Sequence, residues 1–302
     1  PSLLFGVLSI PLIYRLGMTM KFPWSSALLS AVLMAMSWPH LKYSMEGRGY
    51  GITIFLVLLV IYSAIQFLNR SCWVWGSILI ASGFAMTMAL PSNLFFLGGL
   101  TVFTVIVGWF DSEKSRFNIK RLFWLAIPQL IMFALIAVYF FVIYEQLKYG
   151  KDIQPQSLDG ARVKEIAELL VAPWGLWLYL FFAIGTWRLK RIRERVVFAS
   201  IFFIPMILTL ITGAVGYARV YVYWLPFVLF LSAYGMTEVI SWLKEKKGNL
   251  VYGLGVVMIS PLVFFPAKEI SEYYEARTNG SLIVAGPNAT LSEATKMAVW
   301  VD

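Results

Sequence analysis

The fold is decided by residues 51–65, which read Gly-Ile-Thr-Ile-Phe-Leu-Val-Leu-Leu-Val-Ile-Tyr-Ser-Ala-Ile and carry no charge. Three further uncharged apolar runs cover 123–143, 196–216 and 222–237. A helix needs roughly 17–25 mostly apolar residues to cross the hydrocarbon core of a bilayer. Runs of this length and composition predict membrane-spanning helices.

The composition of the whole chain agrees with this prediction. Of its 302 residues, 60% are hydrophobic and only 14% are charged, and the mean hydropathy is +0.75. Soluble domains carry roughly 25% charged residues, so the composition excludes an ordinary water-soluble globule. We therefore expect an all-α integral membrane protein, a polytopic bundle of about ten transmembrane helices.

Candidate spans can be placed along most of the chain. They lie at roughly 2–14, 24–38, 50–68, 73–90, 94–110, 123–145, 173–187, 196–216, 222–243 and 250–266. This places a membrane domain over 1–267 and the start of an extracytoplasmic soluble segment over 268–302. The sequence opens at Pro1 inside an apolar run. We expect a fragment that lacks a first span and a first outer loop.

The distribution of basic residues predicts the orientation. If the spans alternate, one set of connections comprises 15–23, 69–72, 111–122, 188–195 and 244–249. These short segments hold 15 of the 25 Lys and Arg residues. Short basic loops face the cytoplasm, so this set is predicted to be cytoplasmic, in a multi-pass protein of the cell membrane. The connection at 39–50 then faces outward.

One outer connection is too polar to be a span. Within 146–172, the apolar residues Val163, Ile166, Ala167 and Leu170 recur at helical spacing, opposite charged residues. The pattern predicts an amphipathic helix at the outer surface, which could be a plain connection or could cover a substrate.

The outer loop at 39–50 is the first candidate site. It reads Pro-His-Leu-Lys-Tyr-Ser-Met-Glu-Gly-Arg-Gly-Tyr, a concentration of polar groups in a chain that otherwise avoids them. Lys42 and Arg48 are candidates to bind a phosphate through their positive charges, and the guanidinium of Arg48 can also donate two parallel hydrogen bonds to it. Glu46 could hold a metal ion or a hydroxyl, and His40 and Tyr50 flank the charged group. Alternatively, the cations extend to lipid headgroups and Glu46 pairs with one of them.

A second candidate site is Tyr217-Ala-Arg-Val-Tyr221. Arg219 is the lone charge between Arg195 and Glu238, and it falls at the outer junction of two spans. A charge close to hydrocarbon is costly, which favours a functional role. Extension of the side chain to the interface is the alternative. Tyr217 and Tyr221 are its neighbours in sequence.

Several common chemistries lack their motifs. One His and one Cys cannot build a His/Cys zinc site, and no Gly-rich phosphate loop or Gly-x-Ser-x-Gly elbow occurs. The basic clusters follow the predicted topology, so no nucleic-acid partner is expected. The sequence leaves open whether a metal or other cofactor, such as a divalent cation, is bound.

Two stretches resemble a known family. Residues 1–17, Pro-Ser-Leu-Leu-Phe-Gly-Val-Leu-Ser-Ile-Pro-Leu-Ile-Tyr-Arg-Leu-Gly, are similar to a stretch of membrane glycosyltransferases of the dolichyl-phosphate-mannose-protein mannosyltransferase-like group, which has the C-type glycosyltransferase (GT-C) fold. Residues 44–50, Ser-Met-Glu-Gly-Arg-Gly-Tyr, resemble that family's outer loop, Ser-Gln-Glu-Ala-Arg-Gly-Tyr, with Met45 and Gly47 as departures. The turn at 217–226 is also similar.

The resemblance implies an enzyme, a glycosyltransferase that transfers a sugar from a polyprenyl-phosphate carrier to an acceptor on the outer face. Arg48 and Arg219, with Lys42, would stabilise the phosphate leaving group, and Glu46 would orient the acceptor or help to hold a cation. The family's catalytic acid lies in a first outer loop upstream of Pro1. The implied partners are the lipid donor, an acceptor of unknown class and membrane lipids.

Two other classes of protein stay open. A secondary transporter would carry ionisable residues inside its spans, whereas Glu145 and Glu238 lie near span ends here. A non-catalytic subunit that binds a lipid carrier would need the same apolar spans but no acid in an outer loop.

Overall fold

The computed structural model describes residues 1–45, 49–110, 119–144, 160–172, 174–212 and 218–247, together with the single residues 264, 268 and 271. Most of the last predicted span, 250–266, and of the predicted outer segment, 268–302, lies outside these residues. Both stay predictions.

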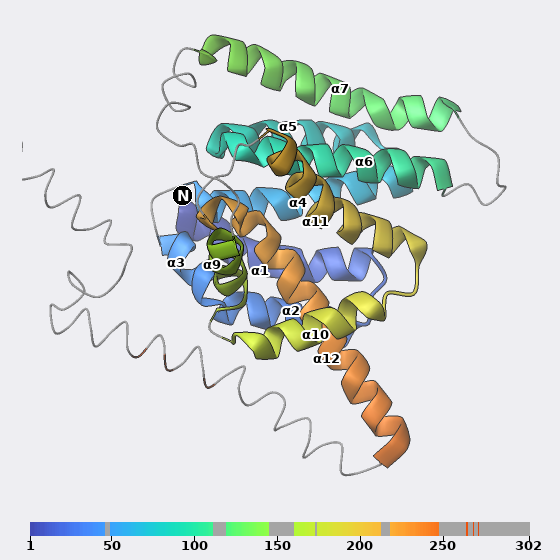
Figure 1. Cartoon of the computed structure of the whole chain (residues 1–302). Helices are drawn as coiled ribbons and strands as arrows, with labels where there is room; N and C mark the ends of the chain where they lie inside the picture. Colours follow the sequence, from blue (N-terminus) through green and yellow to red (C-terminus); the bar gives the residue numbers. More distant parts are fainter. Residues whose placement is uncertain are drawn as a thin grey trace, which may run out of the picture.

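Every regular element in these ranges is helical, which confirms the all-α class (Figure 1). The nine predicted spans that fall within them each contain a helix. The elements are α1 (Ser2–Thr19), α2 (Trp24–Met36), α3 (Trp38–Met45), α4 (Tyr50–Arg70), α5 (Trp73–Ala89), η1 (Pro91–Asn93), α6 (Leu94–Phe110), α7 (Ile119–Val142), α9 (Gly160–Val171), α10 (Leu176–Trp187), α11 (Ile192–Thr212), η2 (Ala218–Trp224) and α12 (Leu225–Lys247).

The bundle is built around two central elements, α4 and the continuous pair η2–α12. In their most apolar windows, 78% of the residues of α4 and 89% of those of η2–α12 are buried, against 28% for α7. Helices α1 and α5 pack against α4, while α2 and α10 pack against α12. Helix α6 lies along α11, and α7 forms an outer layer against α5. The outer helices leave large apolar side chains exposed, as expected where lipid is the solvent.

Ten complete spans are not confirmed. Five helical segments in the described ranges are long and apolar enough to cross a membrane: Ser2–Thr19, Tyr50–Arg70, Phe123–Val142, Ile192–Thr212 and Ala218–Glu245. Trp24–Met36, Trp73–Ala89 and Pro91–Val107 are apolar but shorter. At about 1.5 Å per residue, a helix of this length falls short of the roughly 30 Å hydrocarbon core unless its flanking residues help.

The predicted span at 173–187 is also shorter than a full crossing. Helix α10 has only 12 residues, and the segment Val163–Val171 of α9 lies at 89° to it. Taken together, the two helices are one broken span or a re-entrant pair. The predicted amphipathic helix within 146–172 corresponds to α9. Its Ile166 and Leu170 are buried in the bundle, whereas Val163 is 47% exposed.

Helices α10 and α12 cross at two glycines. A Cβ atom on Gly185 would lie 2.0 Å from the carbonyl oxygen of Leu231, and one on Gly235 would lie 2.0 Å from that of Phe181. Only glycine allows two backbones to approach this closely, a packing mode common between membrane helices.

The connections α1–α2 and α10–α11 lie at one end of the bundle, the basic end, defined by residues 15–23 and 188–195 (Figure 1). Arg191 Nη1 donates to the carbonyl oxygen of Met20 (3.2 Å), which joins the two connections directly. The predicted grouping of these segments on one side is therefore supported, although the structure does not say which side of a membrane it is.

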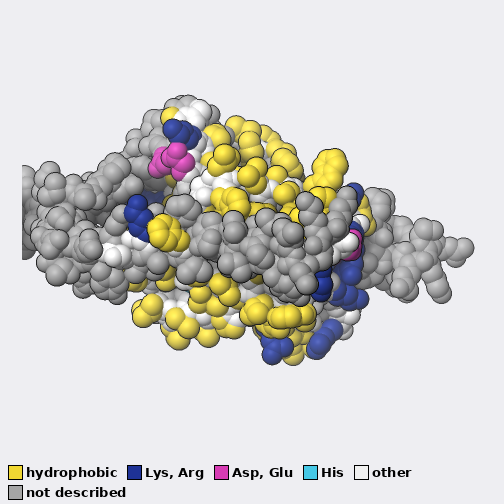
Figure 2. All heavy atoms as spheres, turned by 90° about the horizontal axis from the view of Figure 1, so that it is seen from below, with side chains coloured by type: hydrophobic (Ala, Val, Ile, Leu, Met, Phe, Trp, Pro, Cys, Tyr) yellow, Lys and Arg dark blue, Asp and Glu magenta, His cyan; other side chains and the backbone are white. Residues whose placement is uncertain are grey.

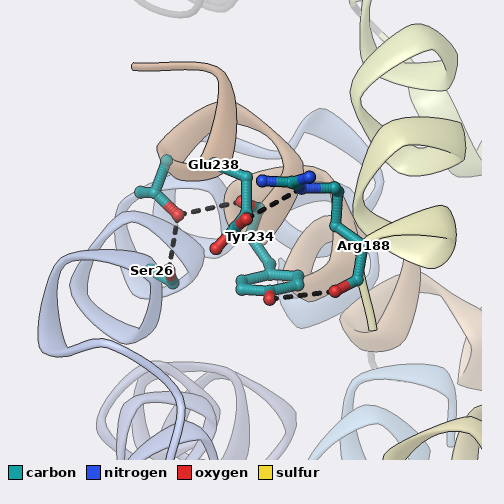
Figure 3. Close-up of polar contacts among 5 residues, drawn as sticks. Ser26, Arg188, Tyr234 and Glu238 are labelled. Atoms are coloured by element: carbon teal, nitrogen blue, oxygen red, sulfur yellow. Dashed lines mark hydrogen bonds and ion pairs between the residues drawn. The ribbon is translucent and has the colours of Figure 1, made fainter. Parts of the chain in front are cut away.

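Polar contacts fasten the basic end to α12 (Figure 3). Arg188 Nε donates to Glu238 Oε2 (3.0 Å), and the Tyr234 hydroxyl donates to the carbonyl oxygen of Arg188 (3.3 Å). The hydroxyls of Ser26 and Thr237 lie 2.6 Å apart and tie α2 to α12. Figure 2 shows apolar side chains across the middle of one face, with most of its visible Lys and Arg toward the right-hand end.

Candidate functional site

The opposite end of the bundle, the α3 end, contains α3, η1, η2 and α9. Helix α9 contacts η2, η2 contacts α4 and η1, and α3 contacts α1 and α4. Both candidate sites from the sequence belong to this end, because 39–50 runs through α3 into α4 and Arg219 lies in η2.

Much of the predicted loop at 39–50 is a helix. Pro39 is the second residue of α3, a position where the missing N–H of proline costs nothing because it would have no helical acceptor. Lys42 is half-buried near the end of α3, where a cation is favoured by the helix dipole.

His40 is buried between α1 and α3. Its side chain is 2% exposed, and its Nε2 lies 2.9 Å from the Ser9 hydroxyl and 3.1 Å from the carbonyl oxygen of Gly6. A carbonyl can only accept, so Nε2 carries the proton. Burial lowers the pKa of His40 to about 4, since the charged imidazolium would lose its hydration. His40 is therefore a neutral packing residue near the predicted site, and a role toward substrate stays a prediction.

The two candidate sites meet at Tyr50 and Arg219. The Arg219 guanidinium carbon lies 6.0 Å from the centre of the Tyr50 ring, within the range of a cation–π contact. Tyr50, at the first residue of α4, also packs on Tyr43, with ring centres 5.1 Å apart. Residues 169 positions apart in the sequence are thus neighbours at the α3 end.

The backbone around Arg219 is held by aromatic packing. Tyr221 lies 5.2 Å from Trp224, ring centre to ring centre, and Trp224 Nε1 donates to the carbonyl oxygen of Ile201 (2.9 Å). Tyr221 is 4% exposed, so it supports η2 rather than lining an open surface. Arg219 itself is half-buried.

The sequence analysis missed a polar contact near the start of α4, the helix that begins with Tyr50. Asn93, at the end of η1, donates through Nδ2 to Thr53 Oγ1 (3.2 Å) and to the carbonyl oxygen of Met86 (2.8 Å). It connects α4, α5 and the start of α6. The Pro91-Ser-Asn93 turn between two apolar runs was the one signal in the sequence that could have found it.

Glu46, Arg48 and Tyr217 lie outside the described residues, so their predicted roles are neither supported nor contradicted. Within the described ranges, no group of three or more His, Cys, Asp or Glu side chains is placed to hold a metal ion. A hollow of about 90 Å³ between α6 and α7 lies away from the Tyr50–Arg219 pair. It is bordered by Thr104, Gln129 and Leu130, and the 65% exposure of Leu130 makes it a feature of the apolar flank.

The fold defines the class of this chain: an α-helical protein with several helices suited to crossing a membrane. Comparison with known proteins does not assign the chain to a family. No family model matches it, and no curated protein matches it at a significant level.

Proposed function

We propose that this protein is a membrane glycosyltransferase that transfers a sugar from a polyprenyl-phosphate carrier to an acceptor at the extracytoplasmic face. The observation that carries the proposal is the proximity of Arg219 to Tyr50. It brings the lone cation of a long apolar region next to the segment whose sequence resembles the glycosyltransferase outer loop. The α3 end would then be the outer face of a GT-C-like bundle.

In this proposal the arginines act on the leaving group. When an acceptor hydroxyl attacks the anomeric carbon, the bond between that carbon and the phosphate oxygen breaks, and negative charge develops on the polyprenyl phosphate. A guanidinium held close to hydrocarbon stabilises such charge more strongly than one in water. Arg219 would supply this stabilisation with Arg48 and Lys42, and Glu46 would orient the acceptor or help to hold a divalent cation.

The positions of charged side chains favour this proposal over a transporter. In the long described helices that could each cross a membrane, Arg15, Arg70 and Glu194 lie near helix ends. Glu238 pairs with Arg188 at the basic end. An ion-coupled transporter typically carries ionisable groups near the middle of the membrane.

The test is a transfer assay with the full-length protein in vesicles, using labelled polyprenyl-phosphate sugars as donors. Arg219→Ala is expected to lower donor affinity and turnover together, because a hydrogen bond between charged groups contributes roughly 1.5–3 kcal/mol. Arg219→Lys should recover only part of the loss, since a point charge lacks the two-pronged geometry.

Arg70→Ala is the matched control, because Arg70 is an exposed arginine at the other end of α4. It should behave like the wild type. Absence of transfer from every donor would overturn the proposal. Wild-type behaviour of both Arg219 variants would reduce Arg219 to an interface anchor.

A further inference from the structure

Asn93 is a buried polar side chain in the turn between α5 and α6. It is fully buried, with 0% exposure, in a bundle whose interior is otherwise mostly apolar. Both of its described side-chain hydrogen bonds are made by Nδ2, to Thr53 on α4 and to Met86 on α5. Its Oδ1 has no hydrogen-bond partner among the described residues. The amide oxygen of the buried Gln129 is in the same situation, so what distinguishes Asn93 is where its Nδ2 hydrogen bonds lead.

The bond to Thr53 acts on the first turn of α4. Thr53 is also fully buried, and its backbone N–H donates to the carbonyl oxygen of Gly49 (2.8 Å), at the start of that turn. On the same side, Gly49 packs against the last residue of α5, since a Cβ atom there would lie 2.8 Å from the carbonyl oxygen of Ala89. The turn that begins α4 is therefore fixed by Asn93 and by close backbone packing.

This turn carries the ring that faces Arg219. Tyr50 is its first helical residue, and both η1 and α4 contact η2. A shift of the turn would move the Tyr50 ring relative to the guanidinium, because the ring is attached to the backbone that Asn93 fixes.

We propose that Asn93 is a positioning residue for the candidate phosphate site: through Thr53 it holds the first turn of α4, and so Tyr50, against Arg219. The inference rests on the proposed function, because the site it serves is the one assigned to the donor phosphate. Asn93 touches no reacting group itself.

The activity test compares Thr53→Val and Asn93→Ala with a control variant, Gln129→Leu, in the full-length protein in vesicles with labelled donor. Thr53→Val replaces the hydroxyl by a methyl group and keeps nearly the same side-chain shape, so it should fold even if Asn93→Ala does not. Both variants are expected to lower kcat/KM for the donor about tenfold, since small displacements of a binding group are costly.

Gln129→Leu is the matched control. Gln129 is also a buried amide that donates to a threonine, Thr104, but it joins α6 to α7, away from Tyr50. It is expected to leave kcat/KM for the donor unchanged. Equal loss of kcat/KM in all three variants would show a merely structural effect and overturn the inference, as would wild-type kcat/KM in Thr53→Val and Asn93→Ala.

A second measurement does not depend on the reaction. Hydrogen–deuterium exchange of peptides covering 49–56 and 218–224 should rise in Thr53→Val and stay unchanged in Gln129→Leu. If the wild type transfers no sugar, the proposed function fails, while a local rise in exchange still supports the role of Asn93 in holding α4. If exchange is unchanged at both segments, or rises equally over α6 and α7, the positioning role is wrong even when the wild type is active.

Discussion

At the scale of single residues, two basic side chains of the α3 end, His40 and Arg219, lie in different environments. His40 is enclosed between α1 and α3, where dehydration keeps the imidazole neutral. Arg219 is half-buried, and its guanidinium carbon lies 6.0 Å from the centre of the Tyr50 ring. Of these two, Arg219 is therefore the side chain whose position suits contact with a charged ligand.

The contact between Arg219 and Tyr50 gives a first prediction. Tyr50→Leu should lower kcat/KM for the lipid donor about two- to fivefold, because a cation–π contact at a partly exposed site is worth roughly 0.5–1 kcal/mol. Tyr50→Phe keeps the ring and should stay near the wild type. If Phe and Leu are equally impaired, the phenol hydroxyl and not the ring is what matters at position 50.

A second prediction concerns pH and His40, the only histidine of the chain, which lies outside the membrane-spanning segments. Its pKa is about 4 in the folded protein against 6.5 ordinarily. Between these values the unfolded chain binds a proton that the folded chain does not. The free energy of unfolding should therefore fall as the pH is lowered, by about 2 kcal/mol between pH 7 and pH 5.

The measurement is the Tm of the purified protein over that pH range, compared with His40→Gln. The glutamine amide can replace the Nε2 donor toward Ser9 but does not titrate, so the Tm of this variant should change little with pH. An equal pH dependence in both proteins would place the titrating group elsewhere.

At the scale of the elements, α12 is positioned by its contact with α10. The element directly before α12 in the chain is η2, which carries Arg219. The packing of α12 therefore also determines where that side chain lies. The Gly185–Gly235 crossing and the polar contacts of the basic end both hold α12.

Gly235→Ala tests this crossing. Its Cβ atom would meet the Phe181 carbonyl oxygen at 2.0 Å, and backbone cannot move aside as a flexible side chain can. We expect a loss of about 3 kcal/mol, measured as a lower Tm in detergent. Gly160→Ala in α9 is the control, because nothing lies within 4 Å of a Cβ atom there. A wild-type Tm for Gly235→Ala would contradict the packing of α10 on α12.

The elements also show what the sequence could predict. Long apolar runs identify the helices, because the need to satisfy backbone polar groups in lipid leaves few other structures. The 89° bend between α9 and α10 and the Gly185–Gly235 crossing depend on contacts between distant segments. Neither leaves a periodic signal in the sequence.

The same limit applies to the candidate site. Arg219 stands out in the sequence because a lone charge in a long apolar region is unusual. That it lies next to Tyr50 depends on how η2 packs against α4. Asn93 was missed because a polar residue at a turn is ordinary, and only its burial and its bonds to α4 and α5 make it informative.

At the scale of the whole molecule, the described helices form a bundle with an apolar flank and two unlike ends. The basic end contains the connections at 15–23 and 188–195. The α3 end contains the short helices α3 and α9 and the Tyr50–Arg219 pair. Since short basic connections stay in the cytoplasm, the α3 end should face outward, which is where the proposed transfer would take place.

This orientation can be tested by labelling single cysteines in intact cells with a membrane-impermeant thiol reagent. In a Cys72→Ser background, Lys164→Cys on α9 should react, because the Lys164 side chain is 75% exposed on the charged face of α9, at the α3 end. Lys190→Cys, at an exposed position of the basic end, should react only after the cells are opened. The reverse pattern would place the basic end outside. It would then also contradict the proposed transfer at the outer face, because the Tyr50–Arg219 pair would face the cytoplasm.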